Sequence, residues 1–192
     1  MSNFQQKLKL TADKVNAFLK SYFKNQSADN KLYEAMEYGL FSGGKMIRSY
    51  LVQSACKIFD IDEKKYIPIA AAVECVHSYS LIHDDLPSMD NDDFRRGKES
   101  THKAYGEYTA ILAGSSLLTL AFEMISDPKF EIDQDIKIKI IHALSSSSGH
   151  LGIAGGQFFD LSLKKSEVDK ETIIDMQNKK TGALMGFCTE VA

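Results

Sequence analysis

Apolar side chains recur every three or four residues along most of this 192-residue chain, and only three prolines interrupt the pattern. This spacing is typical of amphipathic α-helices, because one helical turn takes about 3.6 residues. The expected helices lie near residues 4–22, 32–40, 47–58, 68–85, 104–125 and 132–150, and from 171 onward. Convincing strand-like alternation is absent from the sequence, so we expect an all-α fold. The segment Ala104–Ile125 carries few charges, and we expect it to be buried on most sides.

Bulk composition indicates one ordinary globular domain over residues 1–192. The net charge is −3, which favours neither a nucleic-acid partner nor an acidic-membrane partner. Three separated cysteines form no Cys-x-x-Cys pair, so they indicate buried thiols in a reducing compartment. The N-terminus has no apolar targeting core, and Ile67–Val76 is taken as the longest apolar stretch. We therefore expect a cytoplasmic protein with no membrane partner.

The run from Asp84 to Arg96 is the clearest candidate for chemistry. Asp84 and Asp85 end a mostly apolar helix, on the face that also carries Glu74 and His77. Pro87 should end the helix and allow Asp90 to return beside Asp84 and Asp85. An isolated acidic cluster is more often a solvated turn, but Arg95 and Arg96 follow at once. Carboxylates beside paired arginines suit Mg²⁺, or Mn²⁺, bridging a diphosphate.

Three further motifs are weak when each is taken alone. Gly43-Gly44-Lys45 and Arg48 open a helix that could hold phosphate, although a glycine pair is more often a turn. Gln157 and Asp160 share one helical face, which in isolation is more often surface. Lys180-Thr181 is either an exposed basic patch or a phosphate contact.

Taken together, these motifs resemble the trans-isoprenyl diphosphate synthases (polyprenyl synthetases), and most closely their bacterial farnesyl diphosphate synthases. The similarity runs from about Leu32 to the end of the chain. The matching blocks, in family order, are Gly43-Gly44-Lys45 with Arg48, Ala71–His77, His83–Asp90 with Arg95-Arg96-Gly97, Thr101-His102, Gly156-Gln157 with Asp160-Leu161, and Lys180–Leu184. The resemblance implies antiparallel helices around a deep central cavity, and a homodimer.

The resemblance also implies a reaction and its residues. Mg²⁺ held by Asp84, Asp85 and Asp90 grips an allylic diphosphate (dimethylallyl or geranyl), which ionises and is attacked by isopentenyl diphosphate. The residues implied for isopentenyl diphosphate are Lys45, Arg48, His77 and Arg96. Those implied for the allylic diphosphate are Arg95, Lys180 and Gln157, with Thr181 beside them. Tyr79 and Ser80 are the implied chain-length residues; the aromatic ring favours a farnesyl product and leaves a geranylgeranyl product open.

Two departures from the family pattern set further expectations. Ser49 follows Arg48 where the family usually has proline, which we expect to change only local stiffness. The second aspartate-rich motif of the family is absent from the sequence, and the last helix stops while still apolar. We therefore expect this chain to be the N-terminal part of the family fold, with little or no elongation activity alone. The alternative is a non-catalytic truncated homologue or regulatory subunit of a prenyl diphosphate synthase.

Overall fold

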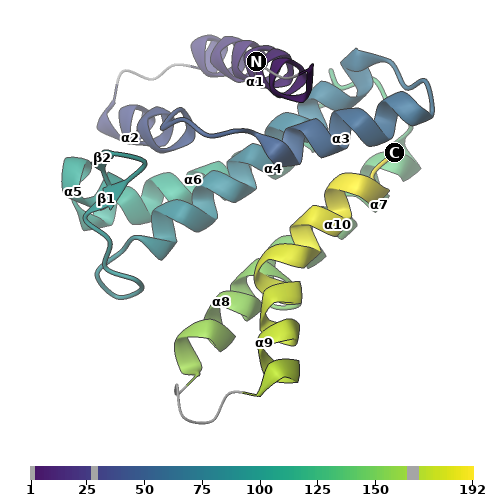
Figure 1. The fold of residues 1–192 in the computed structure, drawn as a ribbon. Coiled ribbons are helices and arrows are strands. Elements are labelled where there is room, and N and C mark those ends of the chain that lie inside the picture. The colour runs from purple at the N-terminus through teal and green to yellow at the C-terminus, as the bar shows by residue number, and fades with distance from the viewer. Residues whose placement is uncertain (1–2, 27–29, 164–168) are drawn as a thin grey trace.

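The computed structural model describes residues 3–26, 30–163 and 169–192, and most of them lie in helices (Figure 1). The helices are α1 (Asn3–Gln26), α2 (Lys31–Leu40), α3 (Ile47–Ile58), α4 (Glu63–Asp84), α5 (Thr101–Tyr105), α6 (Glu107–Ser126), α7 (Gln134–Ser148), α8 (Ile153–Ser162), α9 (Lys170–Gln177) and α10 (Ala183–Glu190), with the π-helix η1 (Asn178–Gly182) between the last two. Two short strands, β1 (Phe94–Arg95) and β2 (Lys98–Glu99), pair antiparallel. The predicted all-α fold is confirmed.

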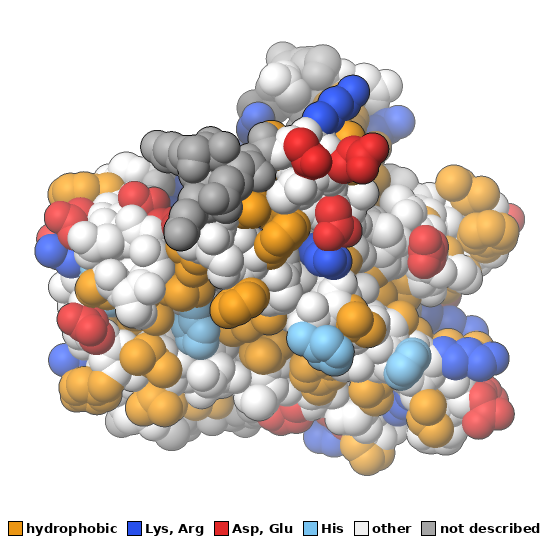
Figure 2. Space-filling view, turned by 90° about the horizontal axis from the view of Figure 1, so that it is seen from below, with side chains coloured by type: hydrophobic (Ala, Val, Ile, Leu, Met, Phe, Trp, Pro, Cys, Tyr) orange, Lys and Arg blue, Asp and Glu red, His pale blue; other side chains and the backbone are white. Residues whose placement is uncertain are grey.

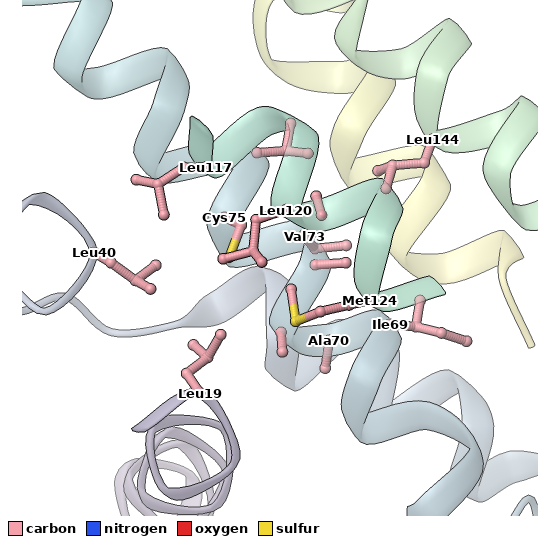
Figure 3. Close-up of a cluster of buried hydrophobic side chains, with 14 of the residues drawn as sticks. Leu19, Leu40, Ile69, Ala70, Val73, Cys75, Leu117, Leu120, Met124 and Leu144 are labelled. Carbon is pink, nitrogen blue, oxygen red and sulfur yellow. The ribbon is translucent and has the colours of Figure 1, made fainter. Parts of the chain in front are cut away.

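The core is centred on α4 and α6, which pack against each other (Figures 1 and 3). Val73 of α4 and Leu117 of α6 are fully buried, and Met124 belongs to the same cluster. α1, α2 and α3 also pack on α4, so that helix is buried on nearly every side between Tyr66 and Val76. The polar C-terminal half of α4 is therefore held in place by a well-packed N-terminal half.

The long helix predicted over Ala104–Ile125 is divided at Gly106, whose φ of +90° separates α5 from α6. The expectation that this segment is buried on most sides is wrong. Tyr108, Ile111 and Leu112 are 71%, 44% and 52% exposed, and they form an apolar surface that we call the α6 stripe. Helical spacing detects such a stripe without showing whether the chain itself covers it.

Among the described helices, α6 is the one that is long and apolar enough to cross a membrane by length and composition. Half of its apolar window is buried inside the protein, and core helices commonly meet the same two criteria, so this is weak evidence. The sequence pattern had indicated Ile67–Val76 as the longest apolar stretch. It had marked the segment of α6 as poor in charges but not as the longest apolar stretch, because Thr and Ser residues interrupt its apolar residues.

The β-hairpin lies between α4 and α5 and was not predicted, because strands of two residues are too short to show alternation. Arg96 and Gly97 occupy the turn between the paired residues Arg95 and Lys98, with φ angles of +54° and +79°. Positive φ at both central positions is what a type I′ hairpin turn requires. The turn carries the Arg96 side chain to the backbone of Gly44.

The C-terminal elements form one continuous helical stretch from Lys170 to Glu190. The helix predicted from Glu171 is therefore confirmed, although the π-turn inside it was not foreseen. α10 packs on α3 and α7 and buries Leu184 and Phe187, while α8 packs against η1. In Figure 1, α8 and α9 lie at the end of the molecule away from α1.

Candidate active site

The acidic run begins where α4 ends, at Asp84. Pro87 has no N–H to extend the helical hydrogen-bond ladder, which explains why the helix stops there. The chain then turns back, so that the backbone N–H of Asp90 donates to the carbonyl of Asp84 over 2.9 Å. The predicted return of Asp90 to Asp84 is confirmed.

The carboxylate of Asp84 sits among groups with opposing effects on its charge. Burial raises its pKa, the charge of Lys180 opposes that rise, and the charge of Asp90 adds to it. Gln157 Nε2 donates a hydrogen bond to the same carboxylate. Asp84 and Asp90 thus offer an oxygen-only donor pair that fits Mg²⁺. Within residues 3–26, 30–163 and 169–192, sets of three His, Cys, Asp or Glu side chains arranged for a metal are absent.

Asp85 is directed away from this pair and toward Arg95. The Arg95 guanidinium donates to both carboxylate oxygens of Asp85, with Nε 2.8 Å from each and Nη2 2.5 Å from Oδ1. Asp85 is 2% exposed, and its hydrogen bonds raise the pKa of Arg95. The sequence-based prediction had grouped Asp85 with Asp84 and Asp90 as metal ligands and had aimed Arg95 at a substrate. In the structure Asp85 and Arg95 are joined to each other, and their metal and substrate roles stay predictions.

A pocket of about 360 Å³, which we call the cationic pocket, opens between the α2–α3 loop, α4 and the hairpin turn. Four residues expected to hold one diphosphate all line it: Lys45, Arg48, His77 and Arg96. In the part of the chain that the structure describes, Arg48 Nε is buried and has no hydrogen-bond partner. A buried donor without a partner is unfavourable, so this pocket is suited to an incoming anion.

Gly44 allows the hairpin turn to close over the cationic pocket. A Cβ at this position would lie 2.6 Å from Nη1 of Arg96, and the φ of Gly44 is +143°. The neighbouring Gly43 also has a positive φ, of +92°, but a Cβ there would meet nothing within 4 Å. The close approach of Arg96 therefore depends on Gly44.

Glu74 brings a buried carboxylate to the cationic pocket, and Ser49 is its partner. The N–H and the hydroxyl of Ser49 lie 3.2 and 2.9 Å from Glu74 Oε1. Burial raises the pKa of Glu74, while the bonds from Ser49 and the charges of Arg48 and Arg96 oppose the rise. The expectation that Ser49 changes only stiffness is wrong, because proline could supply neither hydrogen bond.

His77 is neutral at neutral pH. Burial, together with the charges of Arg48, Arg96 and Arg95, lowers its pKa to about 3. Nη1 of Arg48 lies 3.4 Å from His77 Nε2, which in the neutral ring can accept a hydrogen bond from it. His77 therefore orients Arg48 without adding positive charge to the cationic pocket.

A second pocket, of about 310 Å³, lies between the C-terminal half of α4, α8 and η1, and we call it the apolar pocket. It is lined by eight of the predicted residues: Arg48, His77, Tyr79, Ser80, Asp84, Gln157, Lys180 and Thr181. Ile153, Phe158 and Leu161 contribute apolar walls. Arg48 and His77 line both pockets, so the two pockets adjoin.

Lys180 reaches this pocket from η1, but its charge is already paired. Its Nζ lies 2.7 Å from Asp160 Oδ2, which α8 presents. A Cβ on Gly156 would lie 2.2 Å from the backbone nitrogen of Lys180, so the close packing of α8 on η1 depends on that glycine. Gln157 lines the apolar pocket, and Asp160 on the same helix is the partner of Lys180.

One wall of the apolar pocket is open to solvent. Phe158 is 75% exposed and Leu161 is 46% exposed, although both line the pocket. Exposed hydrophobic side chains are spread over the face of the molecule seen in Figure 2. The pocket as it stands gives incomplete protection from water.

Sequence reasoning missed two classes of residue at this site. The first is the apolar wall on α8, whose short helix gave no distinctive periodicity. The second is His83, which also lines the apolar pocket and lies four residues after Tyr79 on α4. That spacing places the two side chains on one helix face, so a signal for His83 was available.

Comparison with known proteins gives concordant results. A family model described as polyprenyl synthetase matches residues 29–192. Farnesyl diphosphate synthase of Bacillus subtilis (strain 168) is 40% identical over 171 residues, which are 88% of this chain and 58% of that protein. Farnesyl diphosphate synthase of Escherichia coli (strain K12) is 40% identical over 185 residues, which are 95% and 62%. The chain spans less than two thirds of the length of either relative.

Solved structures of prenyl synthases and transferases are also similar to this chain. A geranyltransferase from Legionella pneumophila matches with a TM-score of 0.92 at 40% identity, covering 97% of this chain and 66% of that one. An FPP/GFPP synthase from Zymomonas mobilis, solved in its apo form, matches with a TM-score of 0.88 at 41% identity, covering 97% and 70%.

Proposed function

The chain belongs to the polyprenyl synthetase family, and we propose that it carries the substrate pockets of a short-chain prenyl diphosphate synthase. The cationic pocket binds isopentenyl diphosphate, and the apolar pocket binds an allylic diphosphate such as dimethylallyl or geranyl diphosphate. The observation that carries this proposal is the junction of the two pockets at Arg48 and His77. That junction brings the reacting ends of two diphosphate substrates side by side.

The charges of the cationic pocket support its assignment. Lys45, Arg48 and Arg96 face a single carboxylate, Glu74, and His77 is neutral. The surplus of cations suits a diphosphate, and the planar guanidinium of arginine matches two phosphate oxygens at once. The unpartnered Nε of Arg48 gains a partner when the anion binds.

The acidic end of α4 supports the second assignment. Asp84 and Asp90 would hold Mg²⁺ there, and the bound ion would offset the charge of the leaving diphosphate. Lys180 and Gln157 lie beside Asp84 and bind the remaining diphosphate oxygens. Asp85 fixes Arg95 at the edge of this region.

The reaction follows from this placement. The allylic C–O bond breaks and its electron pair leaves with the diphosphate. The double bond of isopentenyl diphosphate then attacks the allylic cation, and loss of a proton gives the longer product. Ile153, Phe158 and Leu161 give the cation apolar surroundings, but the solvent-open wall on the side of Phe158 leaves it partly accessible to water, which fits the low elongation activity expected of this chain.

Product length and assembly are further parts of the proposal. Tyr79 and Ser80 limit the apolar pocket, which favours a farnesyl product over a geranylgeranyl one. The α6 stripe is an unpartnered apolar surface of the kind that marks protein interfaces, and it supports a homodimer. Light scattering tests this directly: Leu112→Glu should convert a wild-type dimer into a monomer.

A non-catalytic regulatory subunit is the second candidate, and one specific observation favours it. Arg95 and Lys180, which should contact the allylic diphosphate, are paired with Asp85 and Asp160 instead. A chain of this kind would bind substrates or a partner synthase without turning substrates over.

Two measurements on the chain test the proposal. Calorimetry with isopentenyl diphosphate should detect binding, and Mg²⁺-dependent binding of geranyl diphosphate should be lost in Asp84→Asn but retained in Asp92→Asn. Incubation with Mg²⁺, isopentenyl diphosphate and dimethylallyl diphosphate should give little or no elongation. Turnover near that of a longer relative would refute the reduced activity, and equal geranyl diphosphate binding by both variants would remove Asp84 from the site.

A further inference from the structure

Tyr79 and His83 on α4 form a pair of contacting rings at the wall of the apolar pocket. They lie four residues apart, and both line the pocket. Their ring centroids are 4.9 Å apart with an interplanar angle of 76°, which is an edge-to-face contact. The position of the Tyr79 ring is therefore coupled to that of His83.

The His83 ring is held on its other side by α6. Its Nε2 donates to the carbonyl of Ile111 over 3.0 Å. The ring also fills the space left by the missing side chain of Gly114, where a Cβ would lie 2.5 Å from Cδ2 and Nε2 of His83. One hydrogen bond and one close packing contact thus fix the ring that supports Tyr79.

The pair stands where a growing hydrocarbon chain would end. Tyr79 precedes Asp84 by five residues, which is about 7.5 Å along the axis of α4. An allylic ligand whose diphosphate lies at Asp84 and whose tail follows α4 meets the Tyr79 ring. Displacement of that ring would lengthen the space available to the tail.

We propose that His83 is a positioning residue that limits the prenyl chain accepted by the apolar pocket, because it holds the Tyr79 ring across the path of the tail. This inference rests on the proposed function of the apolar pocket. It adds a residue that neither the sequence motifs nor the relatives' names assign. His83 acts through Tyr79 and has no chemical part in the reaction.

The test compares ligand lengths in the intact chain. Calorimetry with Mg²⁺ and without isopentenyl diphosphate gives the affinities for geranyl, farnesyl and geranylgeranyl diphosphate. The wild type should bind the geranyl ligand more tightly than the geranylgeranyl one. His83→Ala should shift this ratio by about tenfold toward the longer ligand. The exposed His142, changed to Ala, is the matched control and should leave the ratio unchanged.

Two conservative variants guard against a folding defect in His83→Ala. His83→Phe keeps the ring and should keep most of the length discrimination, whereas His83→Gln keeps a hydrogen-bond donor and should lose it. A purely structural role would weaken all three ligands alike and leave the ratio fixed. Adding His83→Ala to Tyr79→Ala should cause no further shift, because the two residues act as a unit.

The calorimetry results test the role of His83 separately from the proposed function of the apolar pocket. If the wild type binds none of the three ligands, both the proposed function and the role of His83 are overturned. If it binds them and the ratio is the same in His83→Ala and His83→Gln as in the wild type, only the role of His83 is overturned. A full additional shift in the double variant would show that His83 does not act through Tyr79.

Discussion

The cationic pocket and the apolar pocket adjoin, yet they are built in opposite ways. In the cationic pocket, Arg48 keeps a buried donor without a partner, and Glu74 and Ser49 form a buried support. Three charged groups in or beside the apolar pocket already have partners: Lys180 with Asp160, Arg95 with Asp85, and Asp84 with Gln157. Arg48 lines both pockets, but the charged side chains of Asp84 and Lys180, which line the apolar pocket alone, are already paired.

This difference has a consequence for binding. A ligand that binds an unpartnered donor breaks no ion pair of the protein, whereas a ligand that competes with existing ion pairs must first break them. We therefore expect the isolated chain to bind isopentenyl diphosphate more readily than an allylic diphosphate. Four predictions test this difference, beginning with the largest expected effect.

The first prediction concerns how the stability of the fold depends on pH through His77, which lines the cationic pocket. The pKa of His77 falls from 6.5 to about 3 on folding, so between these values the unfolded chain binds a proton that the folded chain does not. Above pH 6.5 His77 does not lower the free energy of unfolding. As the pH falls from 6.5 towards 3, the free energy of unfolding decreases by about 1.4 kcal/mol for each pH unit because of this group. Urea denaturation from pH 7 to pH 4 should show this decline.

His77→Gln should flatten that decline, while His142→Gln should not. Glu74 has the opposite sign, because its raised pKa means that stability due to this group is lost as the pH rises. Glu74→Gln should therefore steepen the decline toward low pH. An unchanged pH profile in His77→Gln would show that His77 stays accessible to protons in the folded chain.

The second prediction separates the two adjacent arginines. Arg95→Ala leaves the buried Asp85 without its partner and should lower the free energy of unfolding by about 3 kcal/mol, while isopentenyl diphosphate still binds. Arg96→Ala should do the reverse: stability changes little, and affinity for isopentenyl diphosphate falls about 100-fold as a charged contact is lost. Denaturation gives the free energy of unfolding of each variant, and calorimetry gives the affinity of each variant for isopentenyl diphosphate. If both variants lost stability and affinity to the same extent, the paired Arg95 and its neighbour Arg96 would not have the different roles proposed for them.

The third prediction uses the two neighbouring glycines. Gly44→Ala should weaken isopentenyl diphosphate binding about tenfold, because its Cβ displaces the Arg96 guanidinium. Gly43→Ala carries a similar backbone strain but meets no neighbour, so it is the matched control. Equal affinities in the two variants would mean that the hairpin turn adjusts freely around Gly44.

The fourth prediction is the smallest. Ser49→Ala removes the hydroxyl that supports Glu74 and should cost about 1 kcal/mol of stability at pH 7. Combining it with Glu74→Gln should cost less than the sum of the two single changes, because the residues share one interaction. Additive losses in a double-mutant cycle would place the two residues in independent roles.

The sequence predicted what depends on helical periodicity and on local motifs. The polar face of α4 and the return of Asp90 followed from the residues themselves, and the convergence of Lys45, Arg48, His77 and Arg96 followed from the family resemblance. Periodicity could not show that Ile111 and Leu112 would remain exposed, because burial depends on what packs against a helix. The pairing of Asp85 with Arg95 was equally out of reach.

Backbone conformation and contacts between distant segments also could not be predicted from the sequence. The hairpin turn requires a positive φ at Arg96 and at Gly97. The sequence shows that Arg96 carries a charge, but an arginine does not by itself predict a turn with positive φ. The role of Ser49 was missed because it depends on Glu74, which lies one helix away. In both cases the missing information is a contact between segments distant in the sequence.

The π-turn of η1 makes the C-terminal segment intolerant of a change in length. Positions 180, 184 and 187 would share one side of a regular α-helix, which would place Lys180 with the buried side chains of Leu184 and Phe187. A π-turn accommodates one residue more than an α-turn, and so lets Lys180 face the apolar pocket while α10 stays anchored. Deleting one residue from this turn would restore a regular helix and take either the lysine from the site or the anchor from the core. A homologue with a one-residue gap here would thus differ in function even if every remaining residue were identical.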